Sequence, residues 1–437
     1  MILNKSAYNL YYKIQNNNTL VYNTLSGAIL SIPTDFGNHL ENQSFDSSGF
    51  SERTAKILLD NGILVEEHRN ELVDIEQIYR ETCKKNEVLN LFIILTLDCN
   101  FLCPYCYQNK TSQRICKSSS IAIIKFIYDY TENHKLNKIN INWFGGEPLL
   151  NKNAIYEISH AIKVKGLELT STLNTNGYLL DNSLISDFGI LGINELKITI
   201  DGTKTVHDSR RSLKNGQGTF SKIIENVNRV IDLYEKQVSI QISTNIDQNN
   251  IQDYPKFLEF MKPLRNKVVF SFERTRNNLG RGTGYQNTIN QEEFNILAEQ
   301  LYENLSENGF GSRNLPQRIN CACNAELVNS FTLGPDLSIY KCASGINIPE
   351  NRIGHLNRNG EMIFNSIVQE KWNTYDIFKD QECIKCLLLP LCMGGCPEKR
   401  LGLNPGDILP KSCYYDKNFE TVKNRVLFCY NDIANEK

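Results

Sequence analysis

The sequence predicts an α/β protein whose largest part is a partial (β/α)6 barrel of the TIM-like type. From about Val88 onward, apolar strand-like runs alternate with amphipathic helix-like segments six times. Strands that alternate with helices form right-handed βαβ units and a parallel sheet. Six units are fewer than the eight of a closed barrel, so we expect an open sheet. Three closely spaced cysteines follow the first strand, where such sheets carry their chemistry.

Each element of this barrel is predicted from its hydrophobic periodicity. The predicted strands are 88–97, 138–144, 168–174, 195–200, 238–245 and 268–272. The predicted helices are 118–130, 153–164, 182–190, 219–234, 252–261 and 291–306. The helix over 219–234 has the clearest pattern, because Phe220, Ile223 and Val227 recur at helical spacing.

The two ends of the chain differ from the barrel. Residues 8–13 and 19–31 are predicted to be paired strands, and residues 52–60 a helix followed by an Asn61-Gly62 turn. After about residue 310 the alternation stops and cysteines become frequent. The predicted domains are 1–85, a small α+β unit; 86–310, the barrel; and 311–437, a loop-rich segment organised by metal.

Composition excludes several classes of protein. The 437 residues carry 47 basic and 49 acidic side chains, so no charge excess favours nucleic acid or a membrane surface as partner. The longest apolar run is shorter than a transmembrane helix, and we recognise no signal peptide. We therefore expect a cytoplasmic protein, in which 14 cysteines favour metal sites over disulfides.

The cysteine triplet suggests an iron–sulfur site. Cys99, Cys103 and Cys106 have the spacing C-x3-C-x2-C and supply three thiolates. Structural zinc takes four protein ligands, whereas a [4Fe–4S] cluster held by three cysteines leaves one iron open to a chelating cofactor. The triplet alone leaves zinc and disulfides as alternatives.

Polar motifs follow the next four strands in order. They are Gly145-Gly146-Glu147-Pro148, Asn174-Thr-Asn176-Gly177, Thr199-Ile-Asp201-Gly202 and Ser243-Thr-Asn245, with His207, Arg210 and Arg211 after the third. Each motif alone is more often a turn, and a single His is more often structural than catalytic. Because the carboxyl ends of parallel strands share one edge of the sheet, the ordered set predicts one binding site. Glu147 is suited to accept bonds from an ammonium group.

Residues 88–310 resemble the radical S-adenosylmethionine (SAM) superfamily in the C-x3-C-x2-C triplet, the GGEP motif and the partial barrel. The resemblance implies that Cys99, Cys103 and Cys106 hold a [4Fe–4S] cluster whose fourth iron SAM chelates. It also implies that Gly145, Gly146 and Glu147 receive the methionine amino group and that Tyr105 lies near adenine. Weaker candidates for ribose and carboxylate contacts are Asn176, Asp201 and Arg211.

The C-terminal cysteines resemble a SPASM domain, which carries two auxiliary [4Fe–4S] clusters in peptide-modifying enzymes. The run is C-x2-C-x5-C-x3-C-P, and a zinc ribbon is its alternative. By the resemblance, one cluster is held by Cys383, Cys386, Cys392 and Cys413. The other is held by Cys342, Cys396 and the Cys321/Cys323 pair, and whether both members of that pair are ligands stays open. Cys83, Cys116 and Cys429 fit no motif and are expected to be inert.

The first 85 residues resemble, more weakly, the winged-helix-like recognition element of enzymes that modify ribosomally made peptides. Such elements bind the leader of a precursor peptide as an added strand, here expected near residues 19–31. A simple cap on the barrel is the alternative.

These resemblances imply a radical SAM maturase that abstracts hydrogen from a precursor peptide and installs a cross-link, most simply a Cys thioether of the sactipeptide or ranthipeptide type. Three [4Fe–4S] clusters, SAM and a flavodoxin- or ferredoxin-type electron donor are expected. Carbon–carbon cross-linking and epimerisation are alternatives. Anaerobic sulfatase maturation is less favoured, because those enzymes carry an acidic residue where Ala343 follows Cys342. An electron carrier or a peptide-binding scaffold is the non-enzymatic alternative.

Overall fold

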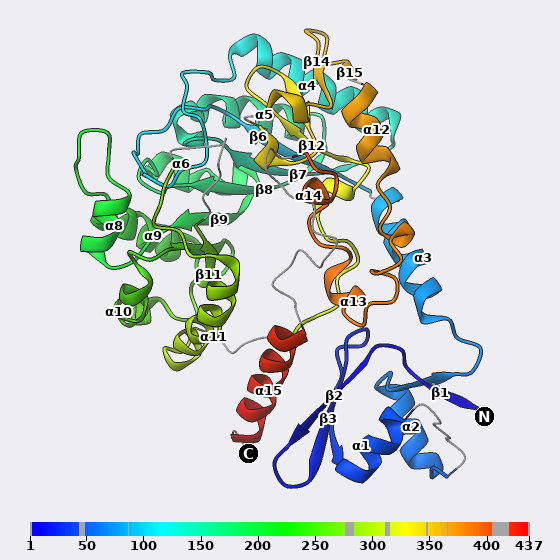
Figure 1. The fold of residues 1–437 in the computed structure, drawn as a ribbon. Helices are drawn as coiled ribbons and strands as arrows, with labels where there is room; N and C mark the ends of the chain where they lie inside the picture. The colour runs from blue at the N-terminus through cyan, green and yellow to red at the C-terminus, as the bar shows by residue number, and fades with distance from the viewer. Residues whose placement is uncertain are drawn as a thin grey trace.

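The computed structural model describes residues 2–42, 49–85, 87–275, 284–310, 315–346, 348–364, 366–403 and 419–435. Its centre is a ten-stranded sheet with the order β11-β10-β9-β8-β7-β6-β12-β13-β14-β15 (Figure 1). The six barrel strands are parallel: β6 Val88–Ile94, β7 Lys138–Phe144, β8 Glu168–Thr175, β9 Ile193–Thr199, β10 Ser239–Ile246 and β11 Val269–Arg274.

The sheet stays open, which confirms the prediction of a partial barrel. β11 forms one end of the sheet, and β6 pairs with β12 (Ser330–Leu333) instead of with β11. The first predicted strand ends at Ile94 and not at Leu97, because the chain turns there into the cysteine loop.

Helices cover the convex face of this sheet. They are α4 Lys117–Asn133, α5 Lys152–Val164, α6 Asn182–Ser186, α7 Phe188–Leu191, α8 Lys204–Arg210, α9 Phe220–Tyr234, α10 Tyr254–Met261 and α11 Gln291–Glu307. The strands turn alternate apolar side chains toward the helices, for example Ile139, Ile141 and Trp143 of β7, which are buried in the main core. The helix predicted over 182–190 is two short helices, with Asp187 between them.

The C-terminal cysteine-rich segment continues the barrel sheet. β12 lies parallel to β6, with Ser330 opposite Asn90, and β13 Ser338–Tyr340, β14 Gly354–Leu356 and β15 Met362–Phe364 follow in antiparallel order. The short helices α12 Ser366–Thr374, α13 Leu389–Cys392 and α14 Pro397–Arg400 come next. The segment is thereby attached to the strand that leads into the cysteine triplet.

The N-terminal unit is a small α+β fold. Its sheet has the order β2-β3-β4, formed by Asn9–Ile14, Asn18–Asn23 and Ile29–Pro33. The helices α1 Thr34–Glu41 and α2 Glu52–Asp60 follow, and β1 Leu3–Lys5 pairs with β5 Leu64–Glu66. β3 is the central strand, so only β2 and β4 have a free edge.

The N-terminal unit is docked on the C-terminal segment (Figure 1). Leu10 and Tyr22 pack with Leu391 and with Val426 of α15 (Phe419–Asn435). The helix α3 (Glu71–Lys84), which the sequence did not predict, leads from this unit to the barrel. Its buried face packs against Ile377 and Leu389, and the Tyr79 hydroxyl donates a 2.8 Å hydrogen bond to Glu326.

None of the helices in the described residues has the length and apolarity that a membrane span requires.

Candidate functional site

The cysteine loop begins directly after β6. The Phe101 N–H donates to the Cys99 sulfur over 3.4 Å, and the Cys106 N–H donates to the Cys103 carbonyl over 3.3 Å. Burial raises the pKa of Cys99 to about 11, so a metal that binds this thiolate must displace a proton. Backbone N–H donors to cysteine sulfur are one of the means by which proteins tune iron–sulfur clusters.

The two glycines of the GGEP motif let the end of β7 lie against the segment that enters the cysteine loop. The Gly146 N–H donates to the Thr96 carbonyl, and the Glu147 N–H donates to the Asp98 carbonyl, each over 2.9 Å. A Cβ on Gly146 would lie 2.2 Å from the Asp98 carbonyl oxygen, and one on Gly145 would lie 2.4 Å from that of Thr96. These positions therefore require glycine for contacts within the chain itself.

Glu147 is fully buried and connects the ends of β7 and β8. Its carboxylate accepts hydrogen bonds from the Leu149 N–H at 3.0 Å, the Thr175 hydroxyl at 2.7 Å and the Asn176 N–H at 2.7 Å. Burial raises the pKa of this carboxyl. The sequence suggested Glu147 as an acceptor for a ligand ammonium group. In the structure, the carboxylate already accepts three hydrogen bonds from the protein itself, out of about four that it can accept.

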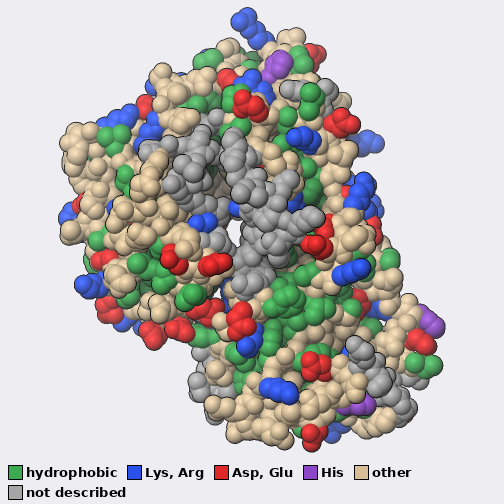
Figure 2. Space-filling view, viewed as in Figure 1, with side chains coloured by type: hydrophobic (Ala, Val, Ile, Leu, Met, Phe, Trp, Pro, Cys, Tyr) green, Lys and Arg blue, Asp and Glu red, His purple; other side chains and the backbone are tan. Residues whose placement is uncertain are grey.

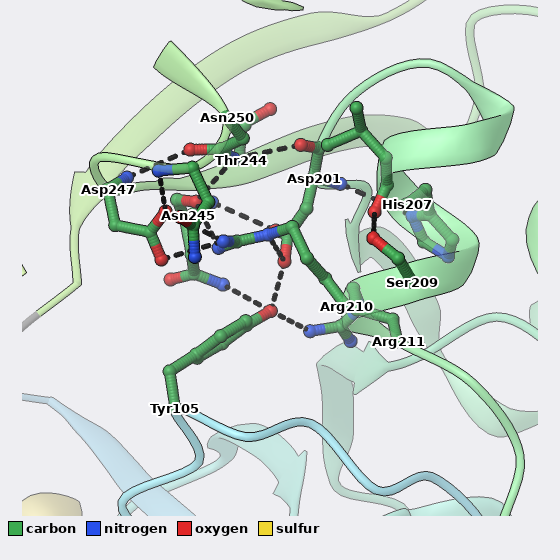
Figure 3. A network of polar contacts seen from close by, with 12 residues as sticks. Tyr105, Asp201, His207, Ser209, Arg210, Arg211, Thr244, Asn245, Asp247 and Asn250 are labelled. Carbon is green, nitrogen blue, oxygen red and sulfur yellow. Dashed lines mark hydrogen bonds and ion pairs between the residues drawn. The ribbon is translucent and has the colours of Figure 1, made fainter. Parts of the chain in front are cut away.

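A buried ion network joins the ends of β9 and β10 to the cysteine loop (Figure 3). Arg210 donates from Nη1 to both oxygens of Asp247 at 2.7 Å and from Nε to Asp201 at 3.3 Å. The Tyr105 hydroxyl donates to Asp201, and Arg210 lies over the Tyr105 ring with its guanidinium carbon 4.9 Å from the ring centre. Tyr105 is thus fixed by its hydroxyl.

Arg211 points toward the same place and keeps an unused donor. Its Nη1 donates to the Tyr105 hydroxyl over 2.7 Å, while its Nε is buried without a hydrogen-bond partner among the described residues. Burial lowers the pKa of Arg211, but the neighbouring Cys103, Tyr105 and Asp201 hold it well above its ordinary value, so the side chain stays charged.

Asn100, in the cysteine loop, has a second unused donor. Its Nδ2 is buried without a hydrogen-bond partner among the described residues, and its Oδ1 accepts 2.8 Å from the Asn176 amide. Two buried donors without partners, one of them cationic, fit an anionic group such as a carboxylate. The structure joins the predicted residues Tyr105, Asp201 and Arg211 in one hydrogen-bonded network, and it bonds Asn176 to Asn100 of the same cysteine loop.

The sequence analysis gave Arg210 no ligand role and did not single out Asp247 or Asn100. Asp247 follows β10 directly after the Ser243-Thr-Asn245 motif, so the rule that favours strand ends could have found it. Asn100 lies between two candidate ligands and could have been found from that position. Arg210 was adjacent to a predicted residue, but its partners belong to distant segments.

His207 has a structural role. The Asp201 N–H donates to its Nδ1 over 3.3 Å, so the proton lies on Nε2, which faces the Thr219 hydroxyl at 3.0 Å. That hydroxyl donates to the Arg211 carbonyl over 2.7 Å. Burial lowers the pKa of His207 to about 3, which keeps the ring neutral. His207 thereby positions the backbone of Arg211.

We expect the free energy of unfolding to fall in acid because buried His207 must stay neutral. Its pKa rises from about 3 in the folded chain to about 6.5 when exposed, so the unfolded chain binds the extra proton. The stability that His207 contributes is complete above pH 6.5 and falls below it, by about 2 kcal/mol at pH 5. The measurement is urea denaturation of the wild type and of His207→Gln, whose side chain cannot titrate. The difference between their free energies of unfolding should change by that amount from pH 7 to pH 5. A constant difference would contradict the neutral assignment.

The C-terminal cysteines form two groups. Cys323 is near Cys342 and Cys396. Burial and then Cys396 raise the pKa of Cys323, while burial, then Glu398 and after it Cys323 bring the pKa of Cys342 to about 12. Cys383 and Cys386 form the other group, in which Arg400 donates 3.0 Å to the Cys383 sulfur. The Ala325 N–H donates to Cys323 and the Leu388 N–H to Cys386, as at Cys99. Cys392 is buried, and Cys413 lies outside the described residues.

Cys321 has a neighbour that the sequence did not suggest. Cys83, on α3, is buried in one apolar cluster with Cys321 and Cys383. Its hydrogen bond with Cys321 raises the pKa of Cys83 and lowers that of Cys321. The sequence analysis expected Cys83 to be inert, and the structure places it beside a candidate ligand.

Among the described residues, no three Cys, His, Asp or Glu side chains are close enough to hold one metal ion. A zinc ribbon needs its ligands on a single ion, whereas each cysteine of a [4Fe–4S] cluster binds a different iron.

An open parallel sheet with a three-cysteine loop after its first strand defines a class of domain. Residues 93–261 match the family described as the Radical SAM superfamily. This part of the chain is a radical SAM domain, which confirms the prediction of a radical SAM enzyme. Such domains work with a [4Fe–4S] cluster and SAM.

A curated relative and a solved structure are each similar to the chain over most of its length. The cysteine-type anaerobic sulfatase-maturating enzyme of Clostridium perfringens (strain 13 / Type A) is 23% identical over 373 residues, which are 77% of this chain and 96% of that enzyme. Native anSMEcpe with bound AdoMet and Kp18Cys peptide has a TM-score of 0.59 at 20% identity and covers 80% of this chain and 98% of its own.

A second solved structure covers more of the chain. Streptococcus suis SuiB bound to the precursor peptide SuiA has a TM-score of 0.51 at 13% identity and covers 92% of this chain and 96% of its own. Coverage of 92% leaves about 35 residues of this chain unmatched. The N-terminal unit contains 85 residues, which is more than that number. The SuiB fold therefore includes a counterpart of at least part of that unit.

Proposed function

We propose that the chain is a radical SAM enzyme that modifies a ribosomally made precursor peptide. The observation that carries the proposal is the cysteine loop, because its Asn100 and the Arg211 that bonds to its Tyr105 each have a buried donor with no hydrogen-bond partner in the described part of the chain. Relatives that mature sulfatases, and a fold match to an enzyme bound to its precursor peptide, support a peptide substrate. The most direct test is anaerobic reductive cleavage of SAM to 5′-deoxyadenosine by the reconstituted enzyme.

The chain's own residues have separate tasks in this proposal. When bound at Cys99, Cys103 and Cys106, the cluster and SAM supply a carbon radical that abstracts hydrogen. Arg211 and Asn100 would bind the carboxylate of SAM. Glu147 fixes the Asn176 backbone beside them, and Gly145 and Gly146 keep this edge close to the cysteine loop. Tyr105 and Asp201 line the remaining side.

The C-terminal cysteines would hold two auxiliary clusters, which makes three clusters in all. Cys323, Cys342 and Cys396, with Cys321 as a candidate fourth ligand, are proposed for one; Cys383, Cys386, Cys392 and Cys413 are proposed for the other. In this division the domains are 1–85, 86–310 and 311–437. The auxiliary clusters would accept the electron released when a cross-link forms, most simply a thioether, and a flavodoxin or ferredoxin would supply the reductant.

Sulfatase maturation is the second candidate, because curated relatives carry that activity. The docked N-terminal unit is the observation that favours precursor peptides instead, since the anSMEcpe match leaves about as many residues uncovered as that unit contains. Incubation with the Kp18Cys peptide, which is bound in one of the anSMEcpe structures, would distinguish the two.

The leader peptide would pair with β4. β3 pairs with β2 on one side and with β4 on the other, so it has no edge to offer a peptide. Within the expected pairing region 19–31, this leaves residues 29–31 of β4. Thr34 N–H bonds to the Asn17 carbonyl and Asn23 N–H to the Ala28 carbonyl, which makes Leu30 and Ile32 the residues hydrogen-bonded to β3. The N–H groups of Ile29 and Ser31 therefore point to the free edge, where a peptide strand would add.

We expect Ser31→Pro to weaken binding of the leader at least tenfold. Proline removes an outward N–H and leaves the hydrogen bonds to β3 intact, and Ser31 is exposed. Ser31→Ala is the matched control and should bind normally. The measurement is fluorescence polarisation with the leader of a precursor encoded beside this gene. Normal binding by Ser31→Pro would show that β4 is not the pairing edge.

A further inference from the structure

The concave face of the six parallel strands, here called the lumen face, is polar at its centre, on β8, β9 and β10, whereas β6, β7 and β11 add the apolar side chains Phe92, Phe144 and Val269. Side chains on the opposite face are apolar and packed on helices. The alternate positions, which point into the lumen, include Asn142, Thr172, Asn174, Lys197, Gln241 and Ser243, all but Thr172 partly exposed. Closed barrels fill their interior with layers of Val, Ile and Leu. The centre of this lumen face is therefore built to contact hydrophilic material.

Strand register places a lysine at the centre of this face. Asn174 of β8, Lys197 of β9 and Gln241 of β10 are direct neighbours across the sheet. Thr172 and Glu195 form the row below. Lys197 lies two residues before the end of β9 and four residues before Asp201, which is about 13 Å along the chain from the edge where the cysteine loop lies.

Lys197 has capacity for a ligand. Its Nζ lies 3.4 Å from Glu195 Oε1, and the two side chains are 38% and 33% exposed. A half-exposed pair of this kind contributes little to stability, and an ammonium group has three donors. Glu195 has its own second partner, the Thr172 hydroxyl at 2.8 Å. A carboxylate that enters the lumen can therefore replace Glu195 at Lys197.

The polar surface continues away from the site edge. A cavity of about 580 Å³ lies at the amino ends of the strands and is lined by Asn140, Thr170, Thr172 and Glu195, among others. From Thr170 to Asn176 the lumen face extends about 20 Å, the length of about six residues of extended peptide.

The charges of this face are unevenly placed. Lys138 and Glu168 pair at the amino-terminal rim, and Glu273 is on β11, two strands from Lys197. Lys197 is the cation of the lumen face nearest the reaction edge on the described strands β6 to β11. The neighbours of Lys197 on the adjacent strands, Asn174 and Gln241, are neutral, so a ligand carboxylate that displaces Glu195 from Lys197 meets one cation among hydrogen-bonding groups.

We infer that the lumen face binds a polar segment of the peptide substrate and that Lys197 is a specificity-determining residue that binds an Asp or Glu carboxylate of that segment. This inference rests on the proposed function, because it takes a peptide as the substrate.

The test uses the full-length enzyme, reconstituted with clusters and loaded with SAM. The probes are three pools of capped, fluorescein-labelled ten-residue peptides whose central positions are Asp or Glu, Lys or Arg, or Asn, Gln or Ser. Fluorescence polarisation should show the acidic pool binding at least tenfold more tightly than the basic pool. Equal binding of the three pools, no binding, or preference for another pool would overturn the inference.

Variants give a readout that a merely structural role would not produce. Lys197→Gln should remove the preference, Lys197→Glu should reverse it toward the basic pool, and Lys197→Arg should keep it. Glu195→Gln should tighten binding of the acidic pool severalfold, because it removes the competing carboxylate while its amide oxygen can still accept from Thr172. Lys138→Gln, also a lumen-face lysine 3.4 Å from a glutamate, is the matched control and should keep the wild-type preference.

An unchanged preference in Lys197→Glu, with iron content equal to the wild type, would overturn the inference. If Lys197→Glu fails to fold, Lys197→Gln and Glu195→Gln decide the question. The proposed function is tested separately by peptide-free cleavage of SAM in the wild-type enzyme. Absence of that cleavage would refute the radical chemistry whatever the peptide preference.

Discussion

Replacement of Cys99, Cys103 and Cys106 together by alanine will abolish reductive cleavage of SAM and remove about a third of the iron from the reconstituted enzyme. The three thiolates are the only protein ligands proposed for the cluster that binds SAM, and without them the open iron is lost. The C-terminal cysteines are in separate groups, so their iron should remain. Iron analysis and chromatography of 5′-deoxyadenosine measure the two effects.

The matched control for the triple variant is Cys116→Ala. Cys116 is an exposed thiol outside the cysteine loop. Its sulfur contacts the hydroxyls of Ser118 and Ser119. This variant should keep full iron content and full cleavage. Cleavage that persists in the triple variant would show that the radical cluster is held elsewhere.

Arg210→Ala will lower the free energy of unfolding by about 3–5 kcal/mol and abolish binding of SAM. Arg210 is 5% exposed and neutralises Asp201 and Asp247, both fully buried, so its removal leaves two buried carboxylates without their cation. Tyr105 would lose both the cation over its ring and the fixed position of its hydroxyl acceptor. Urea denaturation and isothermal titration with SAM are the measurements.

Arg229→Ala is the control for charge removal. Arg229 pairs with Glu225 one helical turn away on α9, with side chains 37% and 49% exposed. Exposed pairs of this kind contribute about 0.3–0.5 kcal/mol, so this variant should unfold and bind SAM almost as the wild type does. Equal stability of Arg210→Ala and Arg229→Ala would contradict the structural role of the buried network.

Much of the fold follows from the sequence, because the signals are local. Residues 138–144 alternate Ile139, Ile141 and Trp143 with polar side chains, and the strand has those bounds. The α9 pattern is similarly complete, and the helix begins within one residue of the prediction. Two helices were missed. α8 is only seven residues long and polar, and the apolar side chains of α3 are buried partly by the distant residues Ile377, Leu389 and Met393.

The sequence by itself determined the chemistry of the site: three thiolates at a fixed spacing after one strand, and polar motifs after the next four. Only the tertiary structure decided how these residues are used. In the tertiary structure the Glu147 oxygens accept hydrogen bonds from the protein itself, and Arg210 and Asp247 join the site. It also places Cys83 beside Cys321 and Lys197 at the polar centre of the lumen face. A motif is local in sequence, whereas these contacts depend on sheet register and on the docking of segments tens to hundreds of residues apart.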